Sequence, residues 1–125
     1  MDTKTLTETL TRQADKCWEQ FCEIRPKMVH FNPPKIILSK RLYRTAGYCS
    51  VADNEITLGY KFFIAKPEYY REMFSVILPH ELAHQVHYNM LGQIRPARWH
   101  DAVWGKIMTD FGLPANTYHS MQISR

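Results

Sequence analysis

The segment that most constrains this chain contains two histidines four residues apart, His80 and His84, with Glu81 directly after the first. Its neighbours are apolar at helical spacing, and on a helix residues i and i+4 project from one face. Both imidazoles can therefore reach one metal ion at the usual zinc–nitrogen distance of about 2.0–2.1 Å. Glu81 lies too far round the helix to be an easy third ligand, but it is well placed to take a proton from a metal-bound water. The alternative interpretation is a capping or surface pair of histidines on an ordinary helix.

The length and composition of the chain fit one globular domain over residues 1–125, with 45% hydrophobic and 22% charged residues. No apolar run is long enough to span a membrane, and the N-terminus lacks the apolar core of a signal peptide. We therefore expect a cytoplasmic protein with no membrane partner. The chain has three cysteines and no CxxC pair, so we expect neither a disulfide scaffold nor a thiolate zinc finger.

Hydrophobic periodicity predicts an α+β fold, with helices packed on a small, mostly antiparallel sheet with hairpin connections. The predicted elements are an N-terminal helix at about 4–24, a sheet at about 35–60, the HExxH helix at about 68–91 and a C-terminal helix at about 101–111. Pro79 interrupts the HExxH helix, because proline removes one backbone hydrogen bond and clashes one turn back. We expect a kink or a break there.

Within the sheet region, three short strands are predicted from β-branched and aromatic residues bounded by turn signals. They cover Lys35–Ser39, Tyr43–Ser50 and Ile56–Leu58. The strand around Glu55–Leu58, if it forms the edge that faces the site, is a candidate for holding an extended substrate by backbone pairing.

A catalytic zinc site usually needs a third protein ligand. His87 lies on nearly the same helix face as His80, but about 10.5 Å along the axis, which is too far to close one tetrahedral site. We expect His87 to orient a ligand or to lie at the surface. His100 is the preferred third ligand, because it follows a loop long enough to reverse the chain; Asp101 is the alternative, or a carboxylate that orients an imidazole. The spacing of His119 indicates no role.

The net charge of +4 is uneven, because the stretch Arg25–Arg44 carries six basic residues and no acidic one. Such a stretch can contact the phosphate backbone of DNA. The alternative is a solvated basic strand and loop.

Several segments, taken in order, carry a resemblance: Ala46-Gly47, Glu55 to Leu58, Val76 to His84, His100 to Trp104, Lys106 to Met108, Gly112 to Pro114, and Tyr118-His119. Together they resemble the SprT-like metallopeptidase domain, which is the domain of bacterial SprT and of the eukaryotic protease Spartan. The similarity covers about residues 35–121. A match of several separated segments in the right order is far more specific than HExxH alone.

The resemblance implies a zincin-like minimal metallopeptidase domain with one zinc ion held by His80, His84 and His100, and with Glu81 as catalytic base. It implies hydrolysis of peptide bonds in protein or peptide substrates and, as in Spartan-like members, of proteins crosslinked to DNA. Bacterial SprT-type chains usually continue into a cysteine-rich zinc ribbon. No cysteine follows Cys49, so we expect no ribbon in these residues, and the resemblance does not extend to DNA contact through one.

Two further points concern mechanism. The family pattern makes Tyr118 and His119 candidates for stabilising the oxyanion. The alternative function is a zinc-stabilised, DNA-associated binding module whose peptidase activity is lost. Retention of Glu81 argues against this alternative, because a purely structural zinc site does not need that carboxylate.

Overall fold

The structure is a computed structural model that describes residues 2–91, 102–113 and 119–123. It begins with helix α1 (Thr3–Ile24), where a helix at about 4–24 was predicted. The Asp2 carboxylate caps this helix by accepting a hydrogen bond of 2.7 Å from the backbone N–H of Thr5. The buried residues of α1 recur every three or four positions and form one apolar stripe: Leu6, Leu10, Ala14, Cys17, Trp18 and Phe21. A short 3-10 helix, η1 (Pro26–His30), follows.

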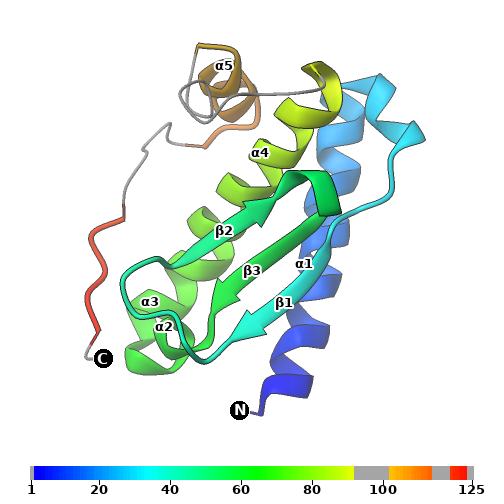
Figure 1. The fold of residues 1–125 in the computed structure, drawn as a ribbon. Helices are drawn as coiled ribbons and strands as arrows, with labels where there is room; N and C mark the ends of the chain where they lie inside the picture. The colour runs from blue at the N-terminus through cyan, green and yellow to red at the C-terminus, as the bar shows by residue number, and fades with distance from the viewer. Residues whose placement is uncertain (1, 92–101, 114–118, 124–125) are drawn as a thin grey trace.

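Three strands, β1 (Lys35–Ser39), β2 (Gly47–Ser50) and β3 (Glu55–Gly59), form one sheet in the order β1-β3-β2 (Figure 1). The α+β class is confirmed. The sheet is mixed, however, and not mostly antiparallel, because β1 is parallel to β3 while β2 is antiparallel to it. The predicted second strand also begins four residues later than expected, at Gly47.

The order of the strands follows from their burial. β3 is buried at four of its five positions, so it takes the centre of the sheet, and the more exposed β1 and β2 take the outside. Between β2 and β3 lies a short 3-10 turn, η2 (Val51–Asp53), which ends at Asn54 in the left-handed conformation (φ 55°). This turn reverses the chain, and asparagine tolerates that conformation better than most residues.

Helices α2 (Tyr60–Ala65) and α3 (Pro67–Glu72) lead into a π-helical turn, η3 (Met73–Ile77), and then into α4 (Leu78–Leu91). The irregularity predicted at Pro79 therefore takes the form of a π turn, and the helix is not broken. The backbone N–H of Leu78 bonds to the carbonyl of Met73, five residues back. This wider turn accommodates a proline that has no N–H to give and whose ring crowds the preceding turn.

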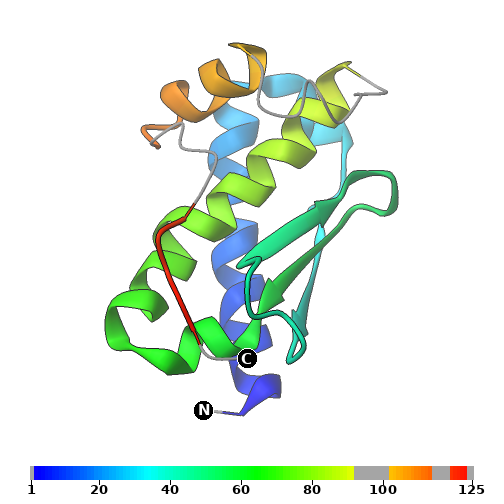
Figure 2. The ribbon, with the colours of Figure 1, turned by 60° about the vertical axis from the view of Figure 1, so that its left-hand side comes forward.

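The molecule has two layers, with the sheet on one side and α1 and α4 on the other (Figure 2). α1 packs against β1, while α4 packs against β2, so the helix that carries the histidines lies directly behind the edge strand β2. Helix α5 (Ala102–Asp110) packs against α4. Among the described residues, no helix is both long enough and apolar enough to cross a membrane.

Two contacts attach α5 to the end of α1. The Arg25 guanidinium pairs with the Asp110 carboxylate at 2.8 Å, and the rings of Phe21 and Phe111 stack with centroids 3.9 Å apart. The C-terminal segment 119–123 returns to α2 and α3, where Met121 is buried and the backbone N–H of Gln122 donates to the Tyr69 hydroxyl at 3.1 Å.

Candidate metal centre

His80 and His84 lie one turn apart near the start of α4, which brings their side chains together. Their Nε2 atoms lie 3.2 Å apart, and both rings are partly exposed. Two nitrogen ligands at about 2.05 Å from one tetrahedral ion are separated by about 3.3 Å, so the observed spacing is the one that a shared zinc ion requires. The residues present therefore fit the metal that the sequence predicted. The same spacing also suits a hydrogen bond between the two imidazoles, which holds them together when no ion is bound.

Trp104 supports both imidazoles from α5. Its ring stacks on His84, with centroids 5.2 Å apart and planes 15° apart, and it meets His80 edge-on at 4.9 Å. Trp104 itself is only 1% exposed. A wide, rigid ring fixed in the core therefore restricts how far either imidazole can rotate, which keeps the two Nε2 atoms aimed at one point.

Glu81 completes the cluster. Ligand atoms of His80, Glu81 and His84 all lie within 4.8 Å of one another. The Glu81 side chain is buried, and this burial raises the pKa of its carboxyl group from 4.5 to about 8. A divalent cation held by the two histidines would favour the charged carboxylate and lower that pKa again.

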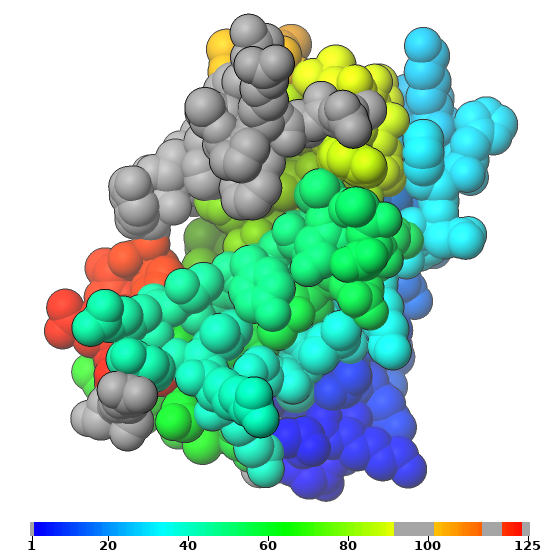
Figure 3. Space-filling model, viewed as in Figure 1, coloured from blue at the N-terminus to red at the C-terminus, as the bar shows by residue number. Residues whose placement is uncertain are grey.

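Within the cluster, the Glu81 carboxyl group lies near β2, close enough to influence the Cys49 thiol, while the two imidazoles contact Trp104 of α5. In the space-filling view, the yellow-green surface of α4 is recessed between β2 and the C-terminal segment 119–123 (Figure 3). The strand beside it, β2, directs the Cys49 thiol at the same helix, where the Sγ–H donates to the Gln85 Oε1 at 3.4 Å. Burial, and then the nearby Glu81 carboxylate, raise the pKa of this thiol, so it remains a protonated donor.

Among the described residues, His30, His87 and His119 are not part of this cluster. His87 is 1% exposed, so the expectation that it lies at the surface is wrong. His119 places its Nε2 2.9 Å from the Arg44 carbonyl oxygen and its ring edge-on against Phe62. The predicted third ligand His100, its alternative Asp101 and the oxyanion candidate Tyr118 lie outside the described residues.

The basic stretch Arg25–Arg44 does not form one patch. Arg25 is committed to Asp110, and Lys35 begins β1. Lys40, Arg41 and Arg44 follow the opposite end of that strand, so a whole strand separates the two groups of cations (Figure 1). The Lys40 ammonium lies over the Tyr60 ring, 5.4 Å from its centroid.

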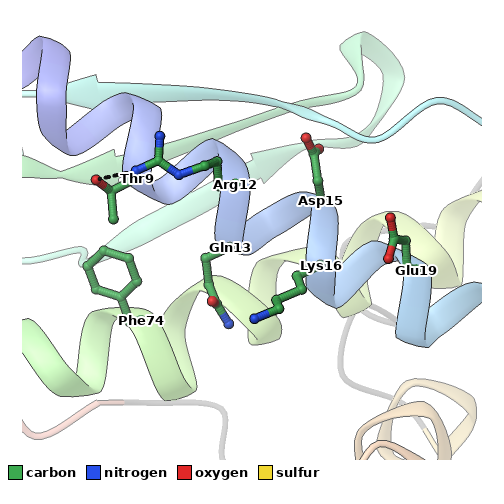
Figure 4. Close-up of a pocket in the computed structure, with 7 residues that line it drawn as sticks. All are labelled: Thr9, Arg12, Gln13, Asp15, Lys16, Glu19 and Phe74. Carbon is green, nitrogen blue, oxygen red and sulfur yellow. Dashed lines mark hydrogen bonds between the residues drawn. The ribbon is translucent and has the colours of Figure 1, made fainter.

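A separate hollow of about 480 Å³ lies along α1, where Phe74 of η3 approaches that helix (Figure 4). It is lined by six residues of α1 and one of η3: Thr9, Arg12, Gln13, Asp15, Lys16, Glu19 and Phe74. The charges are mixed, and Arg12 donates to the Thr9 hydroxyl at 3.4 Å. This lining contains no histidine or cysteine, so the hollow is part of the solvated face of the helix and not of the metal cluster.

Two residues beside the cluster had no predicted role. Trp104 belonged to the family resemblance, but nothing in its spacing indicated that it would contact both histidines. Gln85 is a polar residue in a buried stretch of helix, between His84 and Val86. A polar side chain at a buried helical position was the one sequence feature that could have indicated a structural role for it.

Comparison with known proteins agrees with these features. A profile of the SprT-like family matches residues 6–120. The chain is 34% identical over 96 residues to Protein SprT of Glaesserella parasuis serovar 5, covering 76% of this chain and 57% of that protein. It is 33% identical over 79 residues to Protein SprT of Actinobacillus succinogenes, covering 62% of this chain and 43% of that protein.

The matching part is thus about half the length of these curated relatives. No solved structure was found to match the chain. The family profile begins within α1, well before the segments that carried the resemblance in the sequence, and it extends past α5. Because it spans nearly the whole chain and includes the cluster of His80, Glu81 and His84, the chain belongs to the SprT-like family.

Proposed function

We propose that this chain is a zinc-dependent metallopeptidase in which His80, His84 and His100 hold the zinc ion and Glu81 is the catalytic base. The observation that carries the proposal is the 3.2 Å approach of the two imidazole nitrogens, with the Glu81 carboxylate within 4.8 Å of them. Membership of the SprT-like family supports the same activity.

The role of His100 rests on its position in the sequence, two residues before α5 begins at Ala102. Trp104, in the first turn of α5, contacts both imidazoles, so the start of this helix lies beside the site. Zinc bound there supplies a Lewis acid that polarises a peptide carbonyl and lowers the pKa of a bound water.

Glu81 would move the proton. Its carboxylate accepts a proton from the attacking water and later gives it to the leaving amine. Burial favours the neutral carboxylic acid, while a neighbouring cation favours the carboxylate. These opposed influences act on the one group that, in this proposal, must accept and then release a proton.

The strand proposed to hold substrate must be reassigned. β3, which contains Glu55–Leu58, pairs with β1 on one side and β2 on the other, so it has no open edge. β1 and β2 are the two edge strands of the described sheet, and of these β2 (Gly47–Ser50) is the one that packs on α4. We therefore assign backbone pairing with an extended peptide to β2, which would lay that peptide beside His80 and His84.

The test of the proposal is metal-dependent cleavage. Purified protein should contain about one zinc per chain, and zinc-loaded protein should cleave denatured casein. A chelator should stop the cleavage, and added zinc should restore it. His84→Ala should lose both zinc and cleavage, whereas His30→Ala, at an exposed histidine in η1, should lose neither. Zinc-free protein that cleaves casein as fast as loaded protein would overturn the proposal.

A second candidate function is association with DNA, so that DNA-bound or DNA-crosslinked proteins are the substrates. Lys40, Arg41 and Arg44 are all exposed in the segment between β1 and β2. The Lys40 ammonium lies over the Tyr60 ring. Cations interleaved with aromatic rings suit the phosphates and bases of a single strand. This narrows the proposed DNA contact from Arg25–Arg44 to Lys40–Arg44.

Binding to a fluorescent single-stranded oligonucleotide tests this second function. Replacing Lys40, Arg41 and Arg44 together by alanine should weaken binding and reduce the salt dependence, by a slope of about 0.7 for each lost phosphate contact. Replacing Lys27 and Lys35 is the control and should change little. DNA binding without any cleavage of bound protein would favour the alternative, a zinc-stabilised DNA-associated binding module.

A further inference from the structure

Gln85 connects the metal helix to the edge strand β2. It directly follows His84 on α4, and only 1% of it is exposed. Its Oε1 accepts from the Cys49 thiol at 3.4 Å, and its Nε2 donates to the Val51 carbonyl at 3.1 Å. One side chain thus binds the middle of β2 and the residue that follows the strand.

The same amide is oriented from its own helix. Nε2 also donates to the Asn89 Oδ1 at 2.8 Å, one turn along α4. The Val51 backbone carbonyl can only accept, so it requires the N–H side of the amide, and the thiol is then left to donate to the oxygen. The Val51 carbonyl therefore fixes the orientation of the Gln85 amide, and the contacts with Cys49 and Asn89 are both compatible with that orientation.

β2 depends on such attachments. It has four residues, and β3 supports it along one side only. Its position relative to the histidines is therefore decided by its contacts with α4, which lies directly behind it (Figures 1 and 2). A displacement of about 1 Å between a bound substrate and the reacting groups can lower a rate by about a hundredfold.

We propose that Gln85 is a positioning residue that fixes the β2 edge relative to His80 and His84, and so sets where an extended peptide lies over the metal centre. The inference rests on the proposed function, because it assumes that β2 is the strand that holds the peptide. On one turn of α4, His84 then faces the metal while its neighbour Gln85 determines the position of the substrate strand.

Gln85→Met tests the inference, because methionine keeps the length and apolar bulk of the side chain but removes the donors and the carbonyl oxygen. We expect unchanged zinc content, faster hydrogen exchange in the peptide covering residues 47–51, and a KM for denatured casein raised about tenfold with a smaller change in kcat. The matched control is Trp18→Phe, which removes a different buried hydrogen bond, from the indole N–H to the Phe31 carbonyl at 3.3 Å. It should leave exchange at 47–51 and KM unchanged.

A second pair of variants avoids dependence on the folding of Gln85→Met. Cys49→Ser keeps a donor for the Gln85 oxygen, whereas Cys49→Ala removes it. The serine variant should retain the wild-type KM, and the alanine variant should raise it. Equal KM values for both variants, together with unchanged exchange and KM in Gln85→Met, would overturn the inference, as would loss of zinc from Gln85→Met.

Peptide binding separates this inference from the proposed function. In the Glu81→Gln background, a labelled, unstructured fragment of β-casein should bind without being cleaved, and Gln85→Met should weaken its Kd about tenfold. If the wild type binds zinc but cleaves nothing, the proposed function fails, while this Kd still decides the role of Gln85. An unchanged Kd would overturn the inference whatever the activity of the wild type.

Discussion

The indole ring of Trp104 stacks on the imidazole of His84, with ring centroids 5.2 Å apart and planes inclined by 15°. The two residues come from different helices, α5 and α4, so this stack joins the metal cluster to the last helix of the domain. The same indole meets His80 edge-on, and it is almost fully buried. The geometry of the two histidines therefore depends on the docking of α5.

Trp104→Ala should consequently weaken metal binding. Removing a neighbour that orients metal ligands typically lowers metal affinity about 10- to 100-fold, and a large cavity in the core should also cost about 3–5 kcal/mol of unfolding free energy. A zinc titration against a competing chelator, at a temperature where the variant is folded, measures the first effect. Trp18→Ala empties a comparable buried site on α1 and should destabilise the protein without changing zinc affinity. Equal zinc affinities for the two variants would contradict the role given to Trp104.

Glu81→Gln should stabilise the metal-free protein at alkaline pH. The folded pKa of about 8 lies above the ordinary value of 4.5, so the folded state holds this proton more tightly than the unfolded state does. The stability of metal-free wild type should therefore fall as pH rises from about 4.5 to 8, and the variant should lack that fall. Each pKa unit is worth about 1.4 kcal/mol, which gives an upper limit of about 5 kcal/mol. Urea unfolding in EDTA at pH 5 and pH 8.5 measures the difference, and parallel pH profiles would refute it; the exposed Glu8→Gln is the control.

Two glycines should respond in opposite directions to alanine. A Cβ on Gly47 would lie 2.7 Å from the Leu58 Cδ2 and 3.0 Å from the Thr57 carbonyl oxygen, so Gly47→Ala must push β2 away from β3. We expect a loss of about 1–3 kcal/mol. Gly105 lies within α5, and no side chain or other element among the described residues comes within 4 Å of its Cβ position. Gly105→Ala should therefore add about 0.5–1 kcal/mol to the free energy of unfolding. Thermal unfolding of the two variants decides the matter, and a shift of the same sign in both would contradict it.

Asp110→Asn should destabilise the protein at neutral pH but not in acid. The hydrogen bond from Arg25, and then that from Lys106, hold the pKa of Asp110 below its ordinary value of 3.8. Its contribution to stability is therefore present above pH 3.8 and is lost as pH falls below that value. Urea midpoints of wild type and variant should differ at pH 7 and converge near pH 3. The exposed Asp15→Asn on α1 provides the comparison, and a gap that persists in acid would rule out the ion pair as the cause.

The sequence predicted the local elements well because each is specified by neighbouring residues. The apolar stripe of α1 and the proline at the start of α3 give helix positions directly. Strand pairing depends on residues far apart in sequence, so the parallel pairing of β1 with β3 was not predicted. Burial of β3 on both sides, and not the length of the connecting loops, selected the central strand.

The candidate site was predictable to a similar extent. One helical turn is enough to bring His80 and His84 together, and the structure gives that convergence as 3.2 Å. The contact of Trp104 with both rings and the attachment of Gln85 to β2 arise from how α5 and the sheet pack on α4. The spacing of residues within one segment cannot predict such contacts between separate elements.

The most direct test of the central claim compares zinc-loaded wild type with zinc-loaded Glu81→Gln on denatured casein. The substitution keeps the shape of a side chain that is almost fully buried but removes the carboxylate that accepts the proton. We predict about one zinc per chain in both proteins, cleavage by the wild type, and a rate at least about 100-fold lower in the variant, the loss typical of a missing general base. A variant that binds zinc and cleaves casein at the wild-type rate would contradict the account.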